Sequence, residues 1–257
     1  MLNFPDNDLS LISQGSGTPT LVFLHYFSGA AASWQWVTED LKADFRCVAL
    51  DLPGFGAAPP LASPTLEKYS EFVRQAIAQI GIDACVLVGH SMGGKIALKA
   101  AADWSSATPR LEQVILVAPS PPTQEPMPPE ERDRLLTDHH QFEVAATTVD
   151  SATKQPLPEL RQKLAVRTHV QAEDRAWRWW LCEGMNHSIA EQLSDIKVPV
   201  TVIASPEDPV IPWETIQQEV IDLVPSSKLS AIKGVGHLIP LEVPKELASR
   251  IRQAITI

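Results

Sequence analysis

The sequence has few of the residues that would indicate a disulfide-stabilised or metal-dependent protein. Only three of its 257 residues are cysteines, and Cys47, Cys85 and Cys182 show no Cys-x-x-Cys spacing. An odd, scattered set of this kind indicates neither a disulfide framework nor a structural zinc site. No spacing of histidines and carboxylates predicts a metal site, and no Gly-x-Gly-x-x-Gly motif predicts a nucleotide. We therefore expect no metal and no other cofactor.

Long apolar runs and clusters of basic residues are missing as well. No run reaches the length of a membrane span, and residues 1–6 lack the basic and apolar regions of a secretion signal. The net charge is −10, which makes nucleic acids and anionic membranes poor partners. We expect a cytoplasmic protein, a monomer or homodimer, whose partner is a small-molecule substrate.

What the sequence does contain is an alternation of short apolar segments and helical segments. A chain of 257 residues with 44% hydrophobic content can bury a large core. Continuous apolar strands that alternate with helices predict an α/β fold with a mainly parallel sheet covered on both faces. The predicted strands are 9–13, 20–25, 45–50, 84–89, 113–118, 200–204 and 228–232, and the predicted helices are 33–41, 66–80, 93–103, 213–223 and 244–255.

One stretch interrupts this alternation. The predicted strand 113–118 leads into a proline-rich exit, and the sequence up to residue 194 has no strand signal. We therefore expect residues 119–194 to form an inserted helical lid on a core made of residues 1–118 and 195–257. The lid has an apolar set of side chains that is expected to pack it onto the core: Trp177, Trp179, Trp180, Leu181, Met185 and Ile189.

The most informative segment is 85–94, which passes from an apolar strand through Gly89-His90-Ser91-Met92-Gly93 into a small-residue helix. A tight strand-to-helix turn forces the residue at its apex into an unfavourable backbone geometry. Glycines two positions before and after the apex remove the collisions that side chains would cause there. The hydroxyl of Ser91 is then exposed above the sheet edge, which predicts a nucleophile.

A serine hydroxyl becomes a good nucleophile only when a base takes its proton and a carboxylate holds that base. Asp208 follows the predicted strand 200–204, and His237 follows the predicted strand 228–232. Both are therefore expected at the carboxyl ends of strands, where active sites of parallel sheets lie. The chain order Ser91, Asp208, His237 is the nucleophile–acid–base order of one particular fold. Glu207 is the alternative acid.

Five segments in chain order resemble those of the α/β-hydrolase superfamily, and the resemblance covers nearly the whole chain. It implies an α/β-hydrolase fold with a mostly parallel eight-stranded sheet, helices on both faces and a helical lid. The segments are Leu24-His25-Tyr26-Phe27-Ser28-Gly29 (oxyanion loop), Asp51-Leu52-Pro53-Gly54-Phe55-Gly56 (loop after the fourth strand), Gly89-His90-Ser91-Met92-Gly93-Gly94 (nucleophile elbow), Asp208-Pro209-Val210-Ile211-Pro212 (acid loop) and Gly236-His237 (histidine loop).

The resemblance implies a cofactor-free serine hydrolase that cleaves small carboxylic esters. Ser91 would attack the acyl carbonyl, His237 would act as base and then acid, and Asp208 would orient His237. The backbone N–H groups of Phe27 and Met92 would form the oxyanion hole. Lactones, carbon–carbon bonds of ring-cleavage products and perhydrolysis fit the same triad. A slow-turnover ligand receptor is the alternative from a different functional class.

Two positions depart from the family pattern, because Tyr26 and Ser205 stand where glycine is usual. Tyr26 is expected either to line the substrate pocket or only to pack. The other predicted pocket residues are His90, Trp180 and Leu238, although His90 is also expected to point into the protein. His25 is expected to brace its loop.

Overall fold

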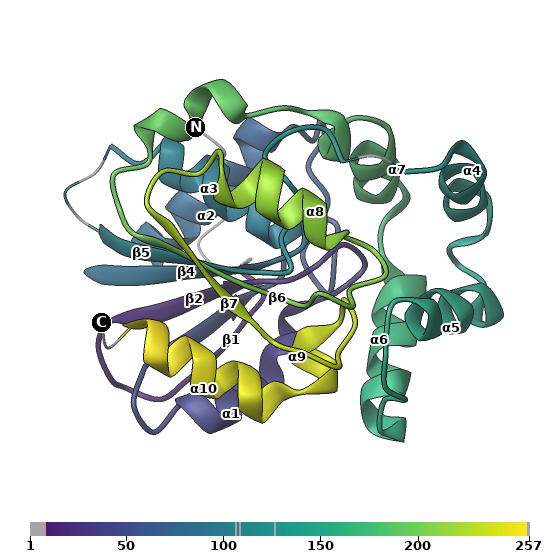
Figure 1. The fold of residues 1–257 in the computed structure, drawn as a ribbon, viewed down its shortest axis with the longest axis horizontal. Coiled ribbons are helices and arrows are strands. Elements are labelled where there is room, and N and C mark those ends of the chain that lie inside the picture. Colours follow the sequence, from purple (N-terminus) through teal and green to yellow (C-terminus); the bar gives the residue numbers. More distant parts are fainter. Residues whose placement is uncertain (1–8, 106, 108, 126, 256–257) are drawn as a thin grey trace.

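A seven-stranded sheet runs through the centre of the computed structural model, which describes residues 9–255 except 106, 108 and 126 (Figure 1). Residues 1–6, where no secretion signal was expected, and both ends of the expected core lie outside the described residues. Neighbouring strands pair in the order β1-β3-β2-β4-β5-β6-β7, and only the β1–β3 pair is antiparallel. The strands are β1 (Leu11–Gln14), β2 (Thr20–Leu24), β3 (Cys47–Leu50), β4 (Ala84–His90), β5 (Arg110–Val117), β6 (Val200–Ala204) and β7 (Ser227–Ala231).

The α/β fold class is confirmed, but the predicted number of strands is wrong. Each of the seven strands overlaps one of the seven apolar segments named from the sequence, with bounds shifted by a few residues at most. The described residues thus form seven strands and not eight, because they contain only these seven strand-forming segments. The eighth strand rested on the family resemblance and had no apolar segment of its own.

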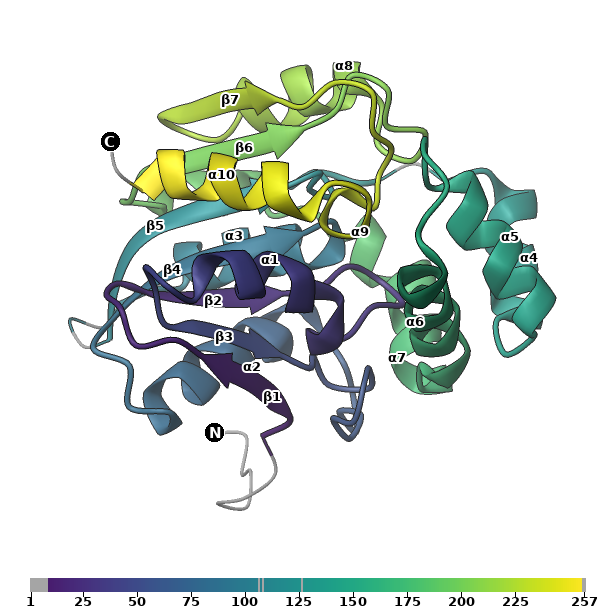
Figure 2. The ribbon, with the colours of Figure 1, turned by 90° about the horizontal axis from the view of Figure 1, so that it is seen from below.

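Helices cover both faces of the sheet (Figures 1 and 2). Helices α1 and α10 pack side by side on one face, and α2 and α3 pack together on the other. The described helices are α1 (Gln35–Leu41), α2 (Leu66–Gln79), α3 (Met92–Ala102), α4 (Pro129–Asp138), α5 (Phe142–Ser151), α6 (Glu159–Gln171), α7 (Asp174–Cys182), α8 (Trp213–Thr215), α9 (Ile239–Glu242) and α10 (Pro244–Ile255), with short helical turns η1 (Ala31–Trp34), η2 (Gly184–Asn186), η3 (Ala190–Asp195) and the π-helical η4 (Ile216–Ile221). Among the described residues, none of the helices is long and apolar enough to cross a membrane.

The sheet is apolar on both faces because each buried strand sends alternate side chains to opposite layers. In β2, Val22 and Leu24 join the core beneath α2 and α3, whereas Leu21 and Phe23 join the core beneath α1 and α10. This two-sided burial explains why the strands read as continuous apolar runs in the sequence.

Helices α4 to α7 stand together beside the edge at which the parallel strands end (Figures 1 and 2). Their attachment to the core is apolar and aromatic, as Trp179 of α7 stacks on Tyr69 of α2 with ring centroids 4.5 Å apart. It also includes Lys95 of α3, which is fully buried and donates hydrogen bonds to the carbonyls of Thr123 (2.7 Å) and Met185 (2.9 Å). Burial lowers the pKa of Lys95 to about 8.

The backbone of the turn between β4 and α3 is strained and closely packed. Ser91 has φ 51° and ψ −118°, a strained conformation for a residue with a side chain. A Cβ on Gly89 would lie 2.3 Å from the Gly93 carbonyl oxygen, and a Cβ on Gly93 would lie 2.4 Å from the Leu24 carbonyl oxygen. Both glycines are required because the crowding atoms belong to backbone that cannot swing aside.

We predict that Gly93→Ala destabilises the fold by at least about 3 kcal/mol, since the new methyl group would overlap backbone. The matched control is Gly81→Ala, where φ is +71° and nothing lies within 4 Å of the added Cβ. That change should cost only about 1–2 kcal/mol for the left-handed conformation. Urea unfolding of both variants gives the comparison, and equal losses would contradict the crowding argument.

Candidate active site

A cavity of about 350 Å³ lies between the carboxyl edge of the sheet and helices α4 to α7. Ser91, Phe27 and His237 contribute to it from the core, and α4 to α7 with their connections form the opposite wall. The wall from residues 119–194 consists of Glu125, Met127, Pro128, Glu131, Leu135, Thr148, Val149, Ser151, Ala152, His169, Trp177 and Trp180.

Ser91 stands at the apex of the β4–α3 turn and faces this cavity. Its backbone is fixed on both sides, because its N–H donates to the Val117 carbonyl (3.0 Å) and its carbonyl accepts from the N–H of Ser120 (3.1 Å). Its hydroxyl, in contrast, has no hydrogen-bond partner within the described part of the chain. The hydroxyl is therefore held in place by backbone and left free for a substrate or a base.

Asp208 and His237 form a buried pair. Nδ1 of His237 lies 2.8 Å from Oδ2 of Asp208, and both side chains are almost fully buried. The other carboxylate oxygen of Asp208 accepts the N–H groups of Val210 (2.8 Å) and Ile211 (3.0 Å). The carboxylate is thus aimed at the ring by its own loop. Because Nδ1 donates to Asp208, Nε2 of the neutral ring carries the free lone pair.

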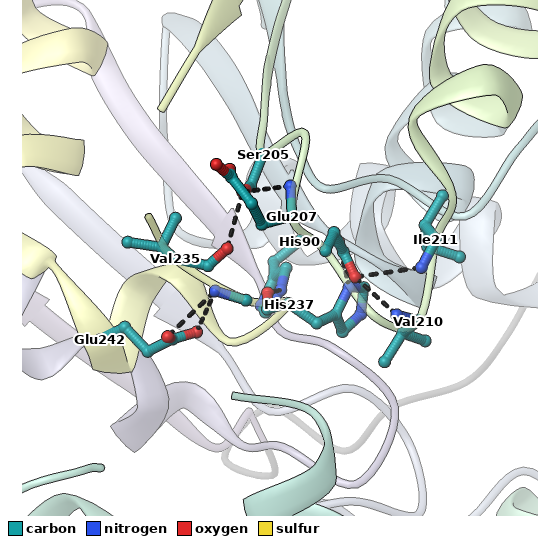
Figure 3. A network of polar contacts seen from close by, with 10 residues as sticks. His90, Ser205, Glu207, Val210, Ile211, Val235, His237 and Glu242 are labelled. Atoms are coloured by element: carbon teal, nitrogen blue, oxygen red, sulfur yellow. Dashed lines mark hydrogen bonds and ion pairs between the residues drawn. The ribbon is translucent and has the colours of Figure 1, made fainter. Parts of the chain in front are cut away.

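Glu207, the alternative acid, does not contact His237. It is exposed, and its carboxylate accepts hydrogen bonds from the Ser205 hydroxyl and the Gly234 N–H, both at 3.2 Å. The Ser205 hydroxyl also lies 2.6 Å from the carbonyl oxygen of Val235. The serine that replaces a family glycine therefore links the acid loop to the histidine loop (Figure 3).

The histidine loop is also tied to the connection between α5 and α6. The N–H of His237 donates to the Ala152 carbonyl at 2.8 Å. The buried carboxylate of Glu242 accepts the N–H groups of Gly236, Lys154 and Gln155 at 2.9–3.1 Å. The carboxylate of Glu242 thus binds backbone N–H groups of both the α5–α6 connection and the histidine loop, and it holds the two segments together.

The electrostatic surroundings of His237 favour its protonated form. Burial lowers the pKa of the ring, but the charge of Asp208, its hydrogen bond and the more distant Glu125 and Glu242 outweigh burial, so the net shift is upward. A base with a raised pKa holds a proton strongly once it has accepted one.

Two N–H groups beside Ser91 are available as donors. Those of Phe27 and Met92 donate to no other described backbone group. Met92 is the first residue of α3, where backbone N–H groups have no partner within the helix. The loop with Phe27 is held by His25, whose Nε2 accepts from Leu52 N–H (3.1 Å) and whose Nδ1 donates to the Tyr26 carbonyl (2.7 Å). Burial lowers the pKa of His25 to about 4, so the brace is neutral.

Three of the four predicted pocket residues line the cavity: Tyr26, Trp180 and Leu238. His90 does not line it. Its ring is buried behind the histidine loop, where Nε2 donates to the carbonyl of His237 at 2.8 Å. His90 therefore supports the loop that carries His237.

Sequence reasoning missed the polar residues that the helical wall brings into the cavity, above all Glu125 and His169. Both are buried, and no motif or spacing in the sequence singles them out. Burial raises the pKa of Glu125, against the lowering effect of the Ser120 hydroxyl and of His237. Burial lowers the pKa of His169 to about 4. The cavity therefore holds an acid that resists ionisation and a histidine that stays neutral.

Comparison with known proteins agrees with the fold. A family model described as "Alpha/beta hydrolase family" matches residues 21–250. The acetyltransferase component of the acetoin cleaving system of Cupriavidus necator is 40% identical over 107 residues, which are 41% of this chain and 28% of that protein. The chain thus spans well under a third of this relative.

Two further proteins match along nearly the whole chain. The uncharacterized hydrolase YugF of Bacillus subtilis is 27% identical over 255 residues, 94% of this chain and 92% of that protein. The structure of an esterase from Exiguobacterium antarcticum superposes with a TM-score of 0.87 at 19% identity, covering 97% of this chain and 96% of that one. At that identity the likeness shows the fold alone.

We predict that Asp208→Asn lowers the pKa of His237 from above to below its ordinary value of 6.5, because burial, the largest effect on the ring, is then opposed only by the more distant charges of Glu125 and Glu242. The amide keeps the oxygen that Val210 and Ile211 N–H groups bind. The measurement is an NMR titration of the histidine ring protons, with exposed His187 as the internal control.

The Asp208→Asn substitution also reverses the pH dependence of the contribution that His237 makes to the free energy of unfolding. In the native chain its raised pKa gives stability that is complete below pH 6.5 and is lost as pH rises through the folded pKa. In Asp208→Asn the depressed pKa gives stability that is present above pH 6.5 and is lost as pH falls through the folded pKa. Unfolding measured across this range should show the two opposite slopes, and a His237 pKa unchanged by the substitution would contradict the prediction.

Proposed function

Because the chain belongs to the α/β-hydrolase family, we propose that it is a serine hydrolase that cleaves small-molecule carboxylic esters through an acyl-enzyme on Ser91. The observation that carries the proposal is the buried Asp208–His237 pair at 2.8 Å, whose histidine lines the same cavity as the unpartnered hydroxyl of strained Ser91. These are the types of side chain that a nucleophile, a base and an acid require.

The first half of the reaction forms the acyl-enzyme. Nε2 of His237 takes the hydroxyl proton as Ser91 Oγ attacks the acyl carbonyl, and the Asp208 carboxylate stabilises the imidazolium that results. The N–H groups of Phe27 and Met92 donate to the oxyanion of the tetrahedral intermediate. When the intermediate collapses, the bond to the alcohol breaks, and the alcohol leaves with the proton held by His237.

The second half is the mirror of the first. Water enters, gives a proton to His237 and attacks the acyl carbon, and the carboxylic acid leaves as Ser91 takes the proton back. The upward shift in the pKa of His237 suits both halves, because the ring must hold the proton long enough to deliver it. No cofactor is needed for these steps.

The charge of the cavity supports a neutral substrate. Glu125 and Glu131 line it, whereas its lining contains neither lysine nor arginine. A carboxylate on the substrate would therefore find no lysine or arginine in the described lining, which disfavours the ring-cleavage dienoates that the sequence left open. Neutral esters and lactones remain compatible, and we propose esters as the principal class. We further propose that residues 119–194 act as the lid that shapes acyl selectivity.

The Ser91→Ala variant tests the nucleophile. We expect hydrolysis of p-nitrophenyl butyrate to fall by at least about 10⁴-fold while the far-ultraviolet circular dichroism stays unchanged, because only the attacking atom is removed. Ser63→Ala, at an exposed loop serine outside the cavity, is the matched control and should retain full turnover. Full turnover by Ser91→Ala would show that Ser91 is not the nucleophile. A single burst without steady-state turnover in the native protein would favour a ligand receptor.

The Glu125→Gln variant tests the charge of the cavity. The native protein should prefer p-nitrophenyl butyrate to mono-p-nitrophenyl succinate, and this preference should grow as pH rises and Glu125 ionises. At a pH at which Glu125 is ionised, Glu125→Gln should raise the relative kcat/KM for the succinate by about tenfold, or ~1.4 kcal/mol, which lies in the range of a partly screened charge interaction. Glu130→Gln, which removes an exposed carboxylate outside the cavity, should leave the ratio unchanged. The same ratio in the native protein and in Glu125→Gln would contradict the neutral-substrate proposal.

A further inference from the structure

Three potential metal ligands meet on the helical wall, on the far side of Trp177 from the cavity. His139 and His140 directly follow α4, and Asp174 is the first residue of α7. Oδ1 of Asp174 lies 3.0 Å from Nε2 of His140 and 3.4 Å from Nε2 of His139. We propose that His139, His140 and Asp174 bind a divalent metal ion of the zinc class, with water in the remaining position.

The distances fit such an ion. Zinc binds imidazole nitrogen and carboxylate oxygen at about 2.0–2.2 Å, so ligand atoms at two corners of a tetrahedral site lie about 3.3–3.6 Å apart. The 3.4 Å distance falls in this range and the 3.0 Å distance is slightly shorter, and all three ligand atoms lie within 4.8 Å of one another. Two imidazoles and one carboxylate suit zinc, nickel or copper and suit magnesium poorly.

The orientation of His140 supports a metal. Its Nδ1 lies 2.8 Å from the carbonyl oxygen of Val170, so Nδ1 carries the proton and donates it there. In the neutral ring Nε2 is then a lone pair that points at a carboxylate oxygen. Two such acceptors repel each other unless a proton or a cation lies between them. Metal-bound histidines commonly fix their second nitrogen on a backbone carbonyl in this way.

His139 is the independent observation that distinguishes a metal from a simple ion pair. It is only 4% exposed, and its Nε2 is buried without a hydrogen-bond partner. An ion pair between protonated His140 and Asp174 would satisfy His140 and leave this buried nitrogen unpaired, at a cost in free energy. A metal ion accepts the lone pairs of both rings and the carboxylate at once.

The position of the site gives it a role in the wall of the cavity. A metal there would join the end of α4 to the start of α7, two helices that α5 and α6 separate in the sequence. The ring of His139 also stacks on Trp177, with centroids 4.3 Å apart and planes 12° apart. Trp177 lines the cavity and packs on Phe27 with centroids 4.2 Å apart. Metal binding would therefore rigidify the wall that faces the substrate.

Calorimetric titration of the chelator-treated protein with Zn²⁺ tests the proposal, with Mg²⁺ as the hard-ion comparison. We expect one saturable Zn²⁺ site that Mg²⁺ does not fill, a zinc-dependent rise in melting temperature, and visible absorption of a four-coordinate complex when Co²⁺ is used. His140→Ala and Asp174→Asn change exposed side chains and should each weaken Zn²⁺ binding at least tenfold.

The matched control is His187→Ala, which breaks an exposed histidine–carboxylate contact of 3.5 Å with Glu67. It should leave Zn²⁺ binding and the melting shift unchanged. Absence of saturable Zn²⁺ binding in the native protein would overturn the proposal. So would native affinity in both His140→Ala and Asp174→Asn, because the ion would then sit elsewhere, including at His237. These measurements do not depend on ester hydrolysis. The metal proposal is therefore tested independently of the proposed function.

Discussion

The position of the candidate active site depends on one backbone contact. Gly93, in the first turn of α3, lies so close to the carbonyls of Leu24 and His25 that a Cβ would come within 2.4–2.6 Å of their oxygens. This contact sets the β4–α3 turn directly against the end of β2. The hydroxyl of Ser91 and the N–H of Phe27 are thereby placed relative to each other by main chain, which has few alternative conformations. The proposed roles of nucleophile and oxyanion donor need this kind of fixed geometry.

The parts of the molecule that backbone rules govern could be predicted from the sequence. Gly89 and Gly93 predicted the tight β4–α3 turn, and the apolar segments predicted all seven strands. Asp208 and His237 could be assigned to one sheet edge because both follow parallel strands. The structure places these two side chains in contact, and Phe27 and Ser91 line the same cavity. Their catalytic roles stay proposals.

What the sequence could not predict lies in contacts between segments that have no fixed spacing. Glu125 enters the cavity from a proline-rich segment, and His169 enters it from the last turn of α6. In the sequence both look like ordinary polar residues. His139 and Asp174 are 35 positions apart and meet only because α4 and α7 pack together. The proposed substrate charge and the proposed metal site both depend on such contacts. His90 was expected either to line the pocket or to point into the protein, and its buried ring, which donates to the His237 carbonyl, agrees with the second expectation.

The carboxylate of Glu242 has a consequence for how this protein tolerates change. It gathers N–H groups from Gly236, one residue before His237, and from residues 154 and 155 in the connection between α5 and α6. Insertions or deletions in that connection would displace the donors and shift the histidine loop with them. New specificities would therefore arise most readily by exchanging side chains on α4 and α7, while the α5–α6 connection keeps its length. In an engineered chimera, this connection should be taken from the same parent as the histidine loop.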